Sequence, residues 1–248
     1  MRSCFKWESM SKTRRRYFVR LVGHCLVLII CAAMLAVEPG EYEVLEDGNF
    51  FKRLSWLHLL WGIWVFDMIE QLVPIKRHVP LGSQKLFAIR FKPILEKVNV
   101  QALKQYIVNT TRSAFWVLVL WCALIAVIGR LHAVRVLSDA ALFLITVIFY
   151  VCDLICVLIW CPFRLIMKNK CCTTCRIFNW DHLMMFSPMI FVKGFYSWSL
   201  LLMAIAVWAV WEVCVAIYPE RFWEQTNGAL RCANCTDKLC TQYCRKLA

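Results

Sequence analysis

The sequence predicts an all-α fold, a polytopic transmembrane bundle of about six membrane helices of which the fifth is short. Three observations lead to this prediction. The 248-residue chain is 61% hydrophobic, with a mean hydropathy of +0.59, whereas about half of a typical soluble domain is apolar. Several apolar stretches approach the ~20 residues that span a bilayer as a helix. The alternating pattern of a membrane barrel is absent from the sequence.

The expected helices are the apolar runs between charged or proline-containing segments. The first four are Phe18–Val37, Leu54–Val73, Ser113–Ile128 and Val136–Phe163. A basic stretch ahead of the third, Val98–Arg112, is expected to lie along the membrane surface as an amphipathic helix. The last apolar region holds about 40 residues, enough for two passages. Lys193-Gly194 divides it into a short helix, Asn179–Val192, capped by Asn179 or Asp181, and a full one, Tyr196–Tyr218.

The net charge of +13 lies in short basic segments that flank the apolar runs. Lys and Arg favour the cytoplasmic side of a membrane, so the N-terminus and the segments after the second and fourth helices are expected there. Six passages would return the C-terminus to that side, whereas five would leave it outside. The lipid bilayer and other membrane subunits are the expected partners. Nucleic acid is not, because the basic residues form no separate domain.

Eight of the fifteen cysteines gather in two clusters, which suggest a metal site. Residues 1–229 are expected to form the transmembrane domain, and the cysteine-rich tail 230–248 is expected to dock on the loop 161–176. Two C-x2-C pairs at one membrane face can give four thiolates to a zinc ion, an iron ion or an iron–sulfur cluster. The first-choice ligands are Cys172, Cys175, Cys232 and Cys235, and the second choices are Cys161, Cys171 and Cys240.

Zinc and an iron–sulfur cluster remain equal alternatives for this site. Disulfides or a dithiol redox couple are a further alternative, and disulfides would need an oxidising compartment and therefore five passages. Cysteines within the apolar helices are interpreted as packing residues. His24 and His58 are isolated on different helices, so haem is not expected.

Ionisable residues also occur inside the expected membrane helices. They are His58, Asp67 and Glu70 in the second helix and Asp139 and Asp153 in the fourth. Such groups are costly at bilayer depth and usually face a bundle interior or a wet cavity. One interpretation is a proton or ion path that involves Asp153 and Asp67. The other is placement at the interface, which Asp139 and Glu70 could reach from near the helix ends.

Five stretches of the sequence resemble bacterial multi-pass integral membrane proteins for which no activity is implied. They are His58-Leu-Leu-Trp, Leu81-Gly-Ser-Gln-Lys, Cys161-Pro-Phe-Arg, the run from Cys171 to Asp181 and the run from Leu230 to Cys240. Cys244 is not part of this pattern. The resemblance implies a location in the bacterial inner membrane.

The leading functional hypothesis is a membrane redox or electron-transfer component, or an accessory subunit, built around a cytoplasmic cysteine site. The alternative is a small-solute or ion transporter in which Asp153 and Asp67 carry the function and the cysteine site is structural. A thiol-disulfide oxidoreductase that uses one C-x2-C pair is the third hypothesis. Whether the protein is an enzyme stays open between them.

Overall fold

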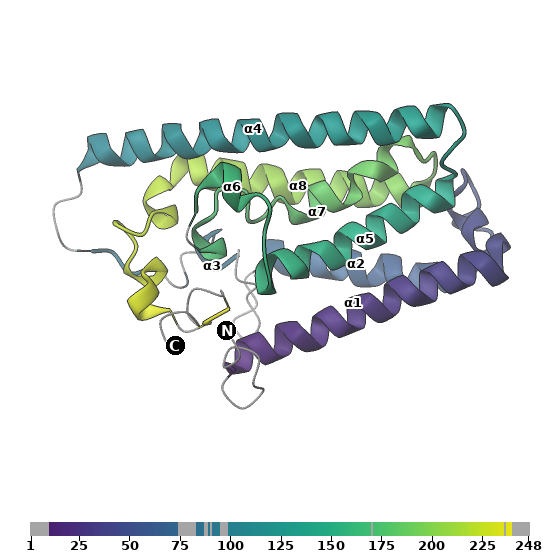
Figure 1. Cartoon of the computed structure of the whole chain (residues 1–248), viewed down its shortest axis with the longest axis horizontal. Helices are drawn as coiled ribbons and strands as arrows, with labels where there is room; N and C mark the ends of the chain where they lie inside the picture. Colours follow the sequence, from purple (N-terminus) through teal and green to yellow (C-terminus); the bar gives the residue numbers. More distant parts are fainter. Residues whose placement is uncertain are drawn as a thin grey trace.

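The computed structural model describes residues 10–73, 83–86, 89, 91–94, 99–169, 171–235 and 237–239, and within them it is an elongated bundle of helices (Figure 1). Four helices are long and apolar enough to cross a membrane, which places the protein in one. They are α1 (Lys12–Val37), α4 (Val100–Ala133), α5 (Asp139–Leu158) and α8 (Phe195–Ile217). An isolated β-bridge joins Pro93 to Asn227, and the described residues contain no strand.

Two shorter helical segments run beside the four long helices. Helix α2 (Leu57–Leu72) has 16 residues and packs against α8. Helix α7 (Asp181–Phe186) continues into the 3-10 helix η5 (Ser187–Phe191), which has Pro188 in its first turn. The position before α7 is Trp180, and no side chain caps it. The expectation that Asn179 or Asp181 caps this helix is therefore wrong.

Helix α4 joins two elements that the sequence separates. The expected surface helix Val98–Arg112 and membrane helix Ser113–Ile128 form one continuous helix of 34 residues, so that prediction is wrong. Asn99 begins it by accepting hydrogen bonds from the N–H groups of Gln101 and Ala102. No Pro or Gly interrupts the helix between its two expected halves, and the Thr110 hydroxyl donates back to the Tyr106 carbonyl within it. Its continuity follows from the absence of a stop signal.

The loops that join the helices gather at two opposite ends. The acidic end is formed by residues 38–56, 134–138 and 192–194. Gly194 lies against the backbone of Leu45 there, and His132 contacts Asp139. This end includes the short 3-10 helix η3 (Pro39–Leu45), which carries Glu41 and Glu43.

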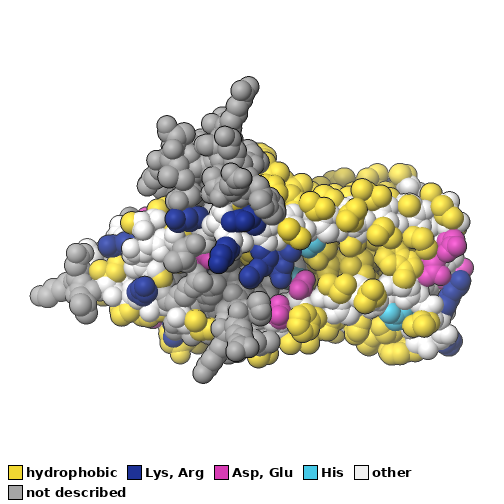
Figure 2. Space-filling view, turned by 90° about the horizontal axis from the view of Figure 1, so that it is seen from below, with side chains coloured by type: hydrophobic (Ala, Val, Ile, Leu, Met, Phe, Trp, Pro, Cys, Tyr) yellow, Lys and Arg dark blue, Asp and Glu magenta, His cyan; other side chains and the backbone are white. Residues whose placement is uncertain are grey.

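The opposite end carries the start of α1 and the last described residues of the tail (Figure 1). This basic end comprises residues 10–16, 91–94, 164–169 and 219–235, together with α3 (Ser83–Leu86) and α6 (Arg164–Met167). The Ser11 hydroxyl donates to the Asp237 carbonyl at 2.7 Å, which ties the start of α1 to the tail. Figure 2 shows Lys and Arg gathered toward this end and an apolar surface along the rest of the bundle. That apolar surface faces lipid.

Aromatic side chains fill the centre of the bundle. Trp64 of α2 contacts Phe143 of α5 and Phe186 of α7, with ring centroids 5.8 Å and 5.2 Å away. The indole N–H of the half-buried Trp61 donates to the Ser199 hydroxyl of α8 at 2.9 Å. These contacts hold α2, α5, α7 and α8 around one core.

Replacement of Gly194 by Ala should destabilise the protein. The added Cβ would lie 2.4 Å from the Leu45 carbonyl oxygen, a backbone atom that cannot rotate away. Overpacking of this kind costs about 1–3 kcal/mol. Thermal unfolding followed by tryptophan fluorescence should show a lower Tm.

Gly62→Ala is the matched control, because a Cβ at Gly62 in α2 meets no atom within 4 Å. Alanine is the better helix former by about 1 kcal/mol, so the Tm of this variant should stay equal or rise. Equal Tm values for the Gly194 variant and the parent would contradict the close packing of this turn.

Candidate functional site

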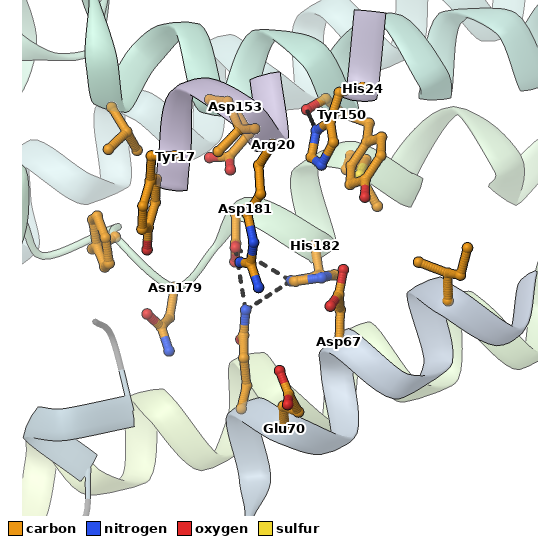
Figure 3. A pocket seen from close by; sticks show the side chains of 16 residues that line it. Tyr17, Arg20, His24, Asp67, Glu70, Tyr150, Asp153, Asn179, Asp181 and His182 are labelled. Atoms are coloured by element: carbon orange, nitrogen blue, oxygen red, sulfur yellow. Dashed lines mark hydrogen bonds and ion pairs between the residues drawn. The ribbon is translucent and has the colours of Figure 1, made fainter. Parts of the chain in front are cut away.

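A cavity of about 290 Å³ lies between α1, α2, α5 and the segment that leads into α7. We call it the acidic cavity, because carboxylates from three elements line it (Figure 3). Its polar lining residues are Tyr17, Arg20, His24, Asp67, Glu70, Gln71, Tyr150, Asp153, Asn179, Asp181 and His182. The cavity sits within the helical bundle, where ionisable groups are costly.

Acidic groups outnumber basic ones in this cavity. Its four carboxyl groups belong to Asp67, Glu70, Asp153 and Asp181, and the one guanidinium is that of Arg20, which points between them (Figure 3). The two histidines add positive charge only when protonated. Several unbalanced carboxylates cannot all remain ionised at close range in a low dielectric. Protons or a bound cation would stabilise this excess of carboxyl groups.

Three side chains form a polar cluster on one wall of the acidic cavity. Gln71 Nε2 donates to Asp181 Oδ2 at 3.3 Å and lies 3.1 Å from His182 Nδ1. His182 Nδ1 in turn lies 3.3 Å from Asp181 Oδ2. On another wall, the His24 ring stacks on Tyr150 with centroids 3.5 Å apart. These contacts hold two titratable rings at the cavity surface.

Two buried polar atoms of the same lining have no hydrogen-bond partner. They are the amide nitrogen of Asn179, a residue only 4% exposed, and the Oδ1 oxygen of Asp181. Buried polar groups in native proteins are nearly always satisfied, by protein atoms, water or a ligand. The acidic cavity therefore has spare capacity to donate and to accept hydrogen bonds.

The structure brings together three of the five intramembrane residues that the sequence singles out. Asp67, Glu70 and Asp153 line the acidic cavity, whereas Asp139 and His58 do not. Asp139 lies at the acidic end, with Oδ1 2.7 Å from His132 Nε2. His58 Nε2 lies 2.8 Å from the Phe50 carbonyl, a local contact within the loop before α2.

A second cavity, of about 280 Å³, lies on the other side of α5 and α7. We call it the cysteine cavity, because Cys152, Cys156, Cys161, Cys171, Cys172 and Cys175 line it. The rest of its lining is mostly apolar and includes Trp121, Phe149 and Phe163. Asp153, Val157, Phe178, Asp181 and Met185 line both cavities. The two cavities thus share a wall.

The cysteine loop is anchored to α8 by a charged contact. Arg176 Nη1 donates to Glu212 Oε1 at 2.7 Å, and the Trp180 indole donates to the same oxygen at 2.8 Å. The Trp211 indole donates to the Arg176 carbonyl at 2.9 Å. Arg–carboxylate pairs with two parallel hydrogen bonds are the strongest of their kind, so the loop is held firmly against the bundle.

The tail cysteines lie apart from the cysteine cavity. Cys232 is exposed and Cys235 is half-buried, and neither is among the residues that line the cavity. Within the described ranges, no three or more His, Cys, Asp and Glu side chains are arranged to hold a metal ion. Cys240 and Cys244 lie outside the described residues. The shared metal centre of Cys172, Cys175, Cys232 and Cys235 therefore stays a prediction.

The tail nevertheless reaches the region of the cysteine loop. Leu239 is buried against Leu158 at the end of α5, with Val157 and Phe178 beside it. Leu158 precedes the loop 161–176 and Phe178 follows it. This contact joins the described part of the tail to both flanks of the loop.

The sequence pattern does not single out several residues that line the two cavities. Among them, Arg20 lies in a basic flank and Asp181 is expected only as a helix cap. His182 carries no signal of its own, and Cys152 and Cys156 are interpreted as packing residues. The single available signal was the combination of Asp181 and His182 beside an apolar run too short to cross the membrane.

The six cavity cysteines differ in their electrostatic surroundings. A hydrogen bond from the Cys156 thiol, with backbone N–H donors from Phe163 and Arg164, lowers the pKa of Cys161 to about 7. Burial raises the pKa of Cys172 to about 12 and also raises that of Cys175. Near neutral pH, Cys161 is therefore the most thiolate-like of these three.

This difference should appear in alkylation as a function of pH. Iodoacetamide reacts with thiolates, so labelling of Cys161 should rise as the pH passes through about 7, while Cys172, with a pKa of about 12, stays largely unlabelled. Cys156→Ala removes the donated hydrogen bond and should move the Cys161 midpoint to higher pH. Peptide mass spectrometry after timed alkylation measures both effects. Equal labelling of Cys161 and Cys172 at pH 7 would contradict this picture.

Comparisons with known proteins add no assignment. No family model matches the chain, and neither a curated protein nor a solved structure matches it.

Proposed function

We propose that the protein is an integral membrane transporter for a small cation, and that the acidic cavity is its binding site. One observation carries this proposal. Carboxyl groups from α2, α5 and α7 converge on a cavity inside a membrane bundle, and the described lining offers a single guanidinium against them. A small cation or protons would complete the charge balance.

Asp67 on α2 and Asp153 on α5 line the acidic cavity from two different helices (Figure 3). Carboxylate oxygens are suitable partners for hard cations. The unpartnered Oδ1 of Asp181 adds one such oxygen. Because no three His, Cys, Asp or Glu side chains of the described residues are arranged to ligate a metal ion together, the cation would keep part of its water shell in the cavity. Arg20 would limit the number of charges that the cavity accepts, because it repels a second cation.

Exchange of a cation for protons follows from this arrangement. When no cation is present, protons must reduce the charge of the carboxyl groups. When a cation enters, it favours the ionised carboxylates and releases those protons. The protein would therefore act as an exchanger, in which a cation crosses the membrane in one direction and protons cross in the other.

The proposal includes six membrane passages, with α2 and the α7–η5 segment as the two that are shorter than a full span. The basic segments at the end with both termini support a cytoplasmic location for that end. The contact of Ser11, at the start of α1, with Asp237 of the tail puts both at one end of the bundle, which an even number of passages requires. The bacterial inner membrane, suggested by the sequence resemblance, is the proposed location, and other membrane subunits are proposed partners.

A reporter fused after Ala248 tests the orientation. An enzyme that is active only in the periplasm should give no signal there, because the tail lies in the cytoplasm. The same reporter inserted after Gly48, in the loop of the acidic end, should be active. A signal from the fusion after Ala248 would contradict the six-passage topology.

Asp153→Asn should reduce cation–proton exchange at least tenfold, because an amide can neither release a proton nor carry the charge that a cation needs. The assay uses proteoliposomes that contain a pH-sensitive dye, with sodium, potassium and magnesium gradients imposed one at a time. Asp67→Asn should have the same effect.

Asp139→Asn is the matched control, since Asp139 is on the same helix but lies outside the acidic cavity, against His132. Its exchange rate should equal that of the parent. If the Asp153 variant transports as well as the Asp139 variant, the acidic cavity is not the transport site.

A cysteine-ligated zinc or iron–sulfur centre is a second proposal, favoured by the loop cysteines that share one cavity. If the loop and tail pairs share a metal, Cys172→Ser and Cys232→Ser should each abolish metal binding, and the double variant should lose little more. Metal analysis with an absorption spectrum of the purified protein measures this, and visible bands would indicate iron–sulfur. Cys122→Ser, on the exposed face of α4, is the control. Metal retained in the Cys232 variant would contradict a shared centre.

A further inference from the structure

Two cysteines near the end of α5 line the same cavity. Cys156 lies in the last turn of that helix and Cys161 follows the helix end, and both border the cysteine cavity. Their thiols also interact, since the Cys156 thiol is the main cause of the lowered pKa of Cys161. This pair is separate from the C-x2-C pairs of the sequence.

The surroundings of the pair favour an apolar reaction partner. The cysteine cavity is lined by Trp121, Phe149 and Phe163 as well as the thiols, and its volume is about 280 Å³. Ligand cavities start at ~300 Å³ and are mostly apolar with few polar groups. A flat ring can enter a space of this size, whereas the folded surface that carries a protein disulfide cannot.

The cavity also reaches the surface that faces lipid. Cys152 lines the cavity and is exposed on α5, and the neighbouring Ile148 is 42% exposed on the same apolar side. A partner dissolved in the membrane could therefore approach from lipid, without passing through water.

We propose that Cys156 and Cys161 form a redox-active dithiol that is oxidised by a membrane-soluble quinone bound in the cysteine cavity. The S–H bonds of both thiols break and one S–S bond forms. The two electrons and the two protons pass to the quinone, which leaves as the hydroquinone. The reaction is balanced without another reactant, and it goes beyond the proposed cation transport because it uses the other cavity.

The test uses the full-length protein in lipid nanodiscs, reduced, treated with a chelator to remove metal, and kept free of oxygen. A short-chain benzoquinone is added, and its loss of absorbance is followed. The remaining thiols are then alkylated, and the linked peptides are identified by mass spectrometry. We expect one quinone reduced per chain and a peptide in which Cys156 is joined to Cys161. If the linked peptide of the parent protein contains a different cysteine pair, the proposal is overturned. This result does not depend on whether the variants fold.

Cys156→Ser and Cys161→Ser should each lower the rate of quinone reduction at least tenfold. Cys122→Ser is the matched control, because Cys122 is an exposed cysteine of α4 that lies outside the cysteine cavity. Its rate should equal that of the parent. Tryptophan fluorescence melting verifies that each variant is folded.

Three results would overturn the proposal. They are a rate that survives in the Cys161 variant, no reduction of the quinone by the parent, and oxidation by water-soluble glutathione disulfide that is as fast as oxidation by the quinone. None of these outcomes bears on the exchange assay with the Asp153 variant. The two proposals therefore fail or stand separately.

Discussion

The short α7–η5 segment is the constraint on which the two cavities depend. Its six α-helical and five 3-10 residues extend about 20 Å, whereas the hydrocarbon core of a bilayer is ~30 Å thick. The chain must therefore return into the bundle before α7 can begin. The cysteine loop fills this return, and the acidic and cysteine cavities lie on the two sides of α5 and α7.

Asp181 is the first residue of α7, and it lies in the wall that the two cavities share. Asp153 of α5 and Asp181 line each of them, so a change of charge in one cavity acts on groups that also face the other. The Arg176–Glu212 pair keeps the loop in position above this wall. A charged pair that is partly buried is effective there because it retains several hydrogen bonds.

Apolar length predicted the long helices well, because a run of ~20 apolar residues has few alternatives in lipid. The break expected at Lys193-Gly194 agrees with the start of α8 at Phe195, whereas the expected helix Asn179–Val192 is a six-residue α-helix followed by a 3-10 helix. Local pattern could not predict that α4 is continuous, because a change from polar to apolar composition does not stop a helix. The convergence of Asp67, Asp153 and Asp181 depends on how three elements pack, and the contact of Cys156 with Cys161 depends on where α5 ends.

The length of α4 has a consequence for what lies outside the membrane. Its 34 residues measure ~51 Å, so about 20 Å extends beyond a hydrocarbon core of ~30 Å. This extension is at the basic end, where Tyr106 stacks on Trp223 with centroids 5.2 Å apart. The helix thus serves as a rigid spacer that fixes the height of the segment after α8. A soluble partner that binds on this side would contact the segment after α8 at a level outside the lipid headgroups.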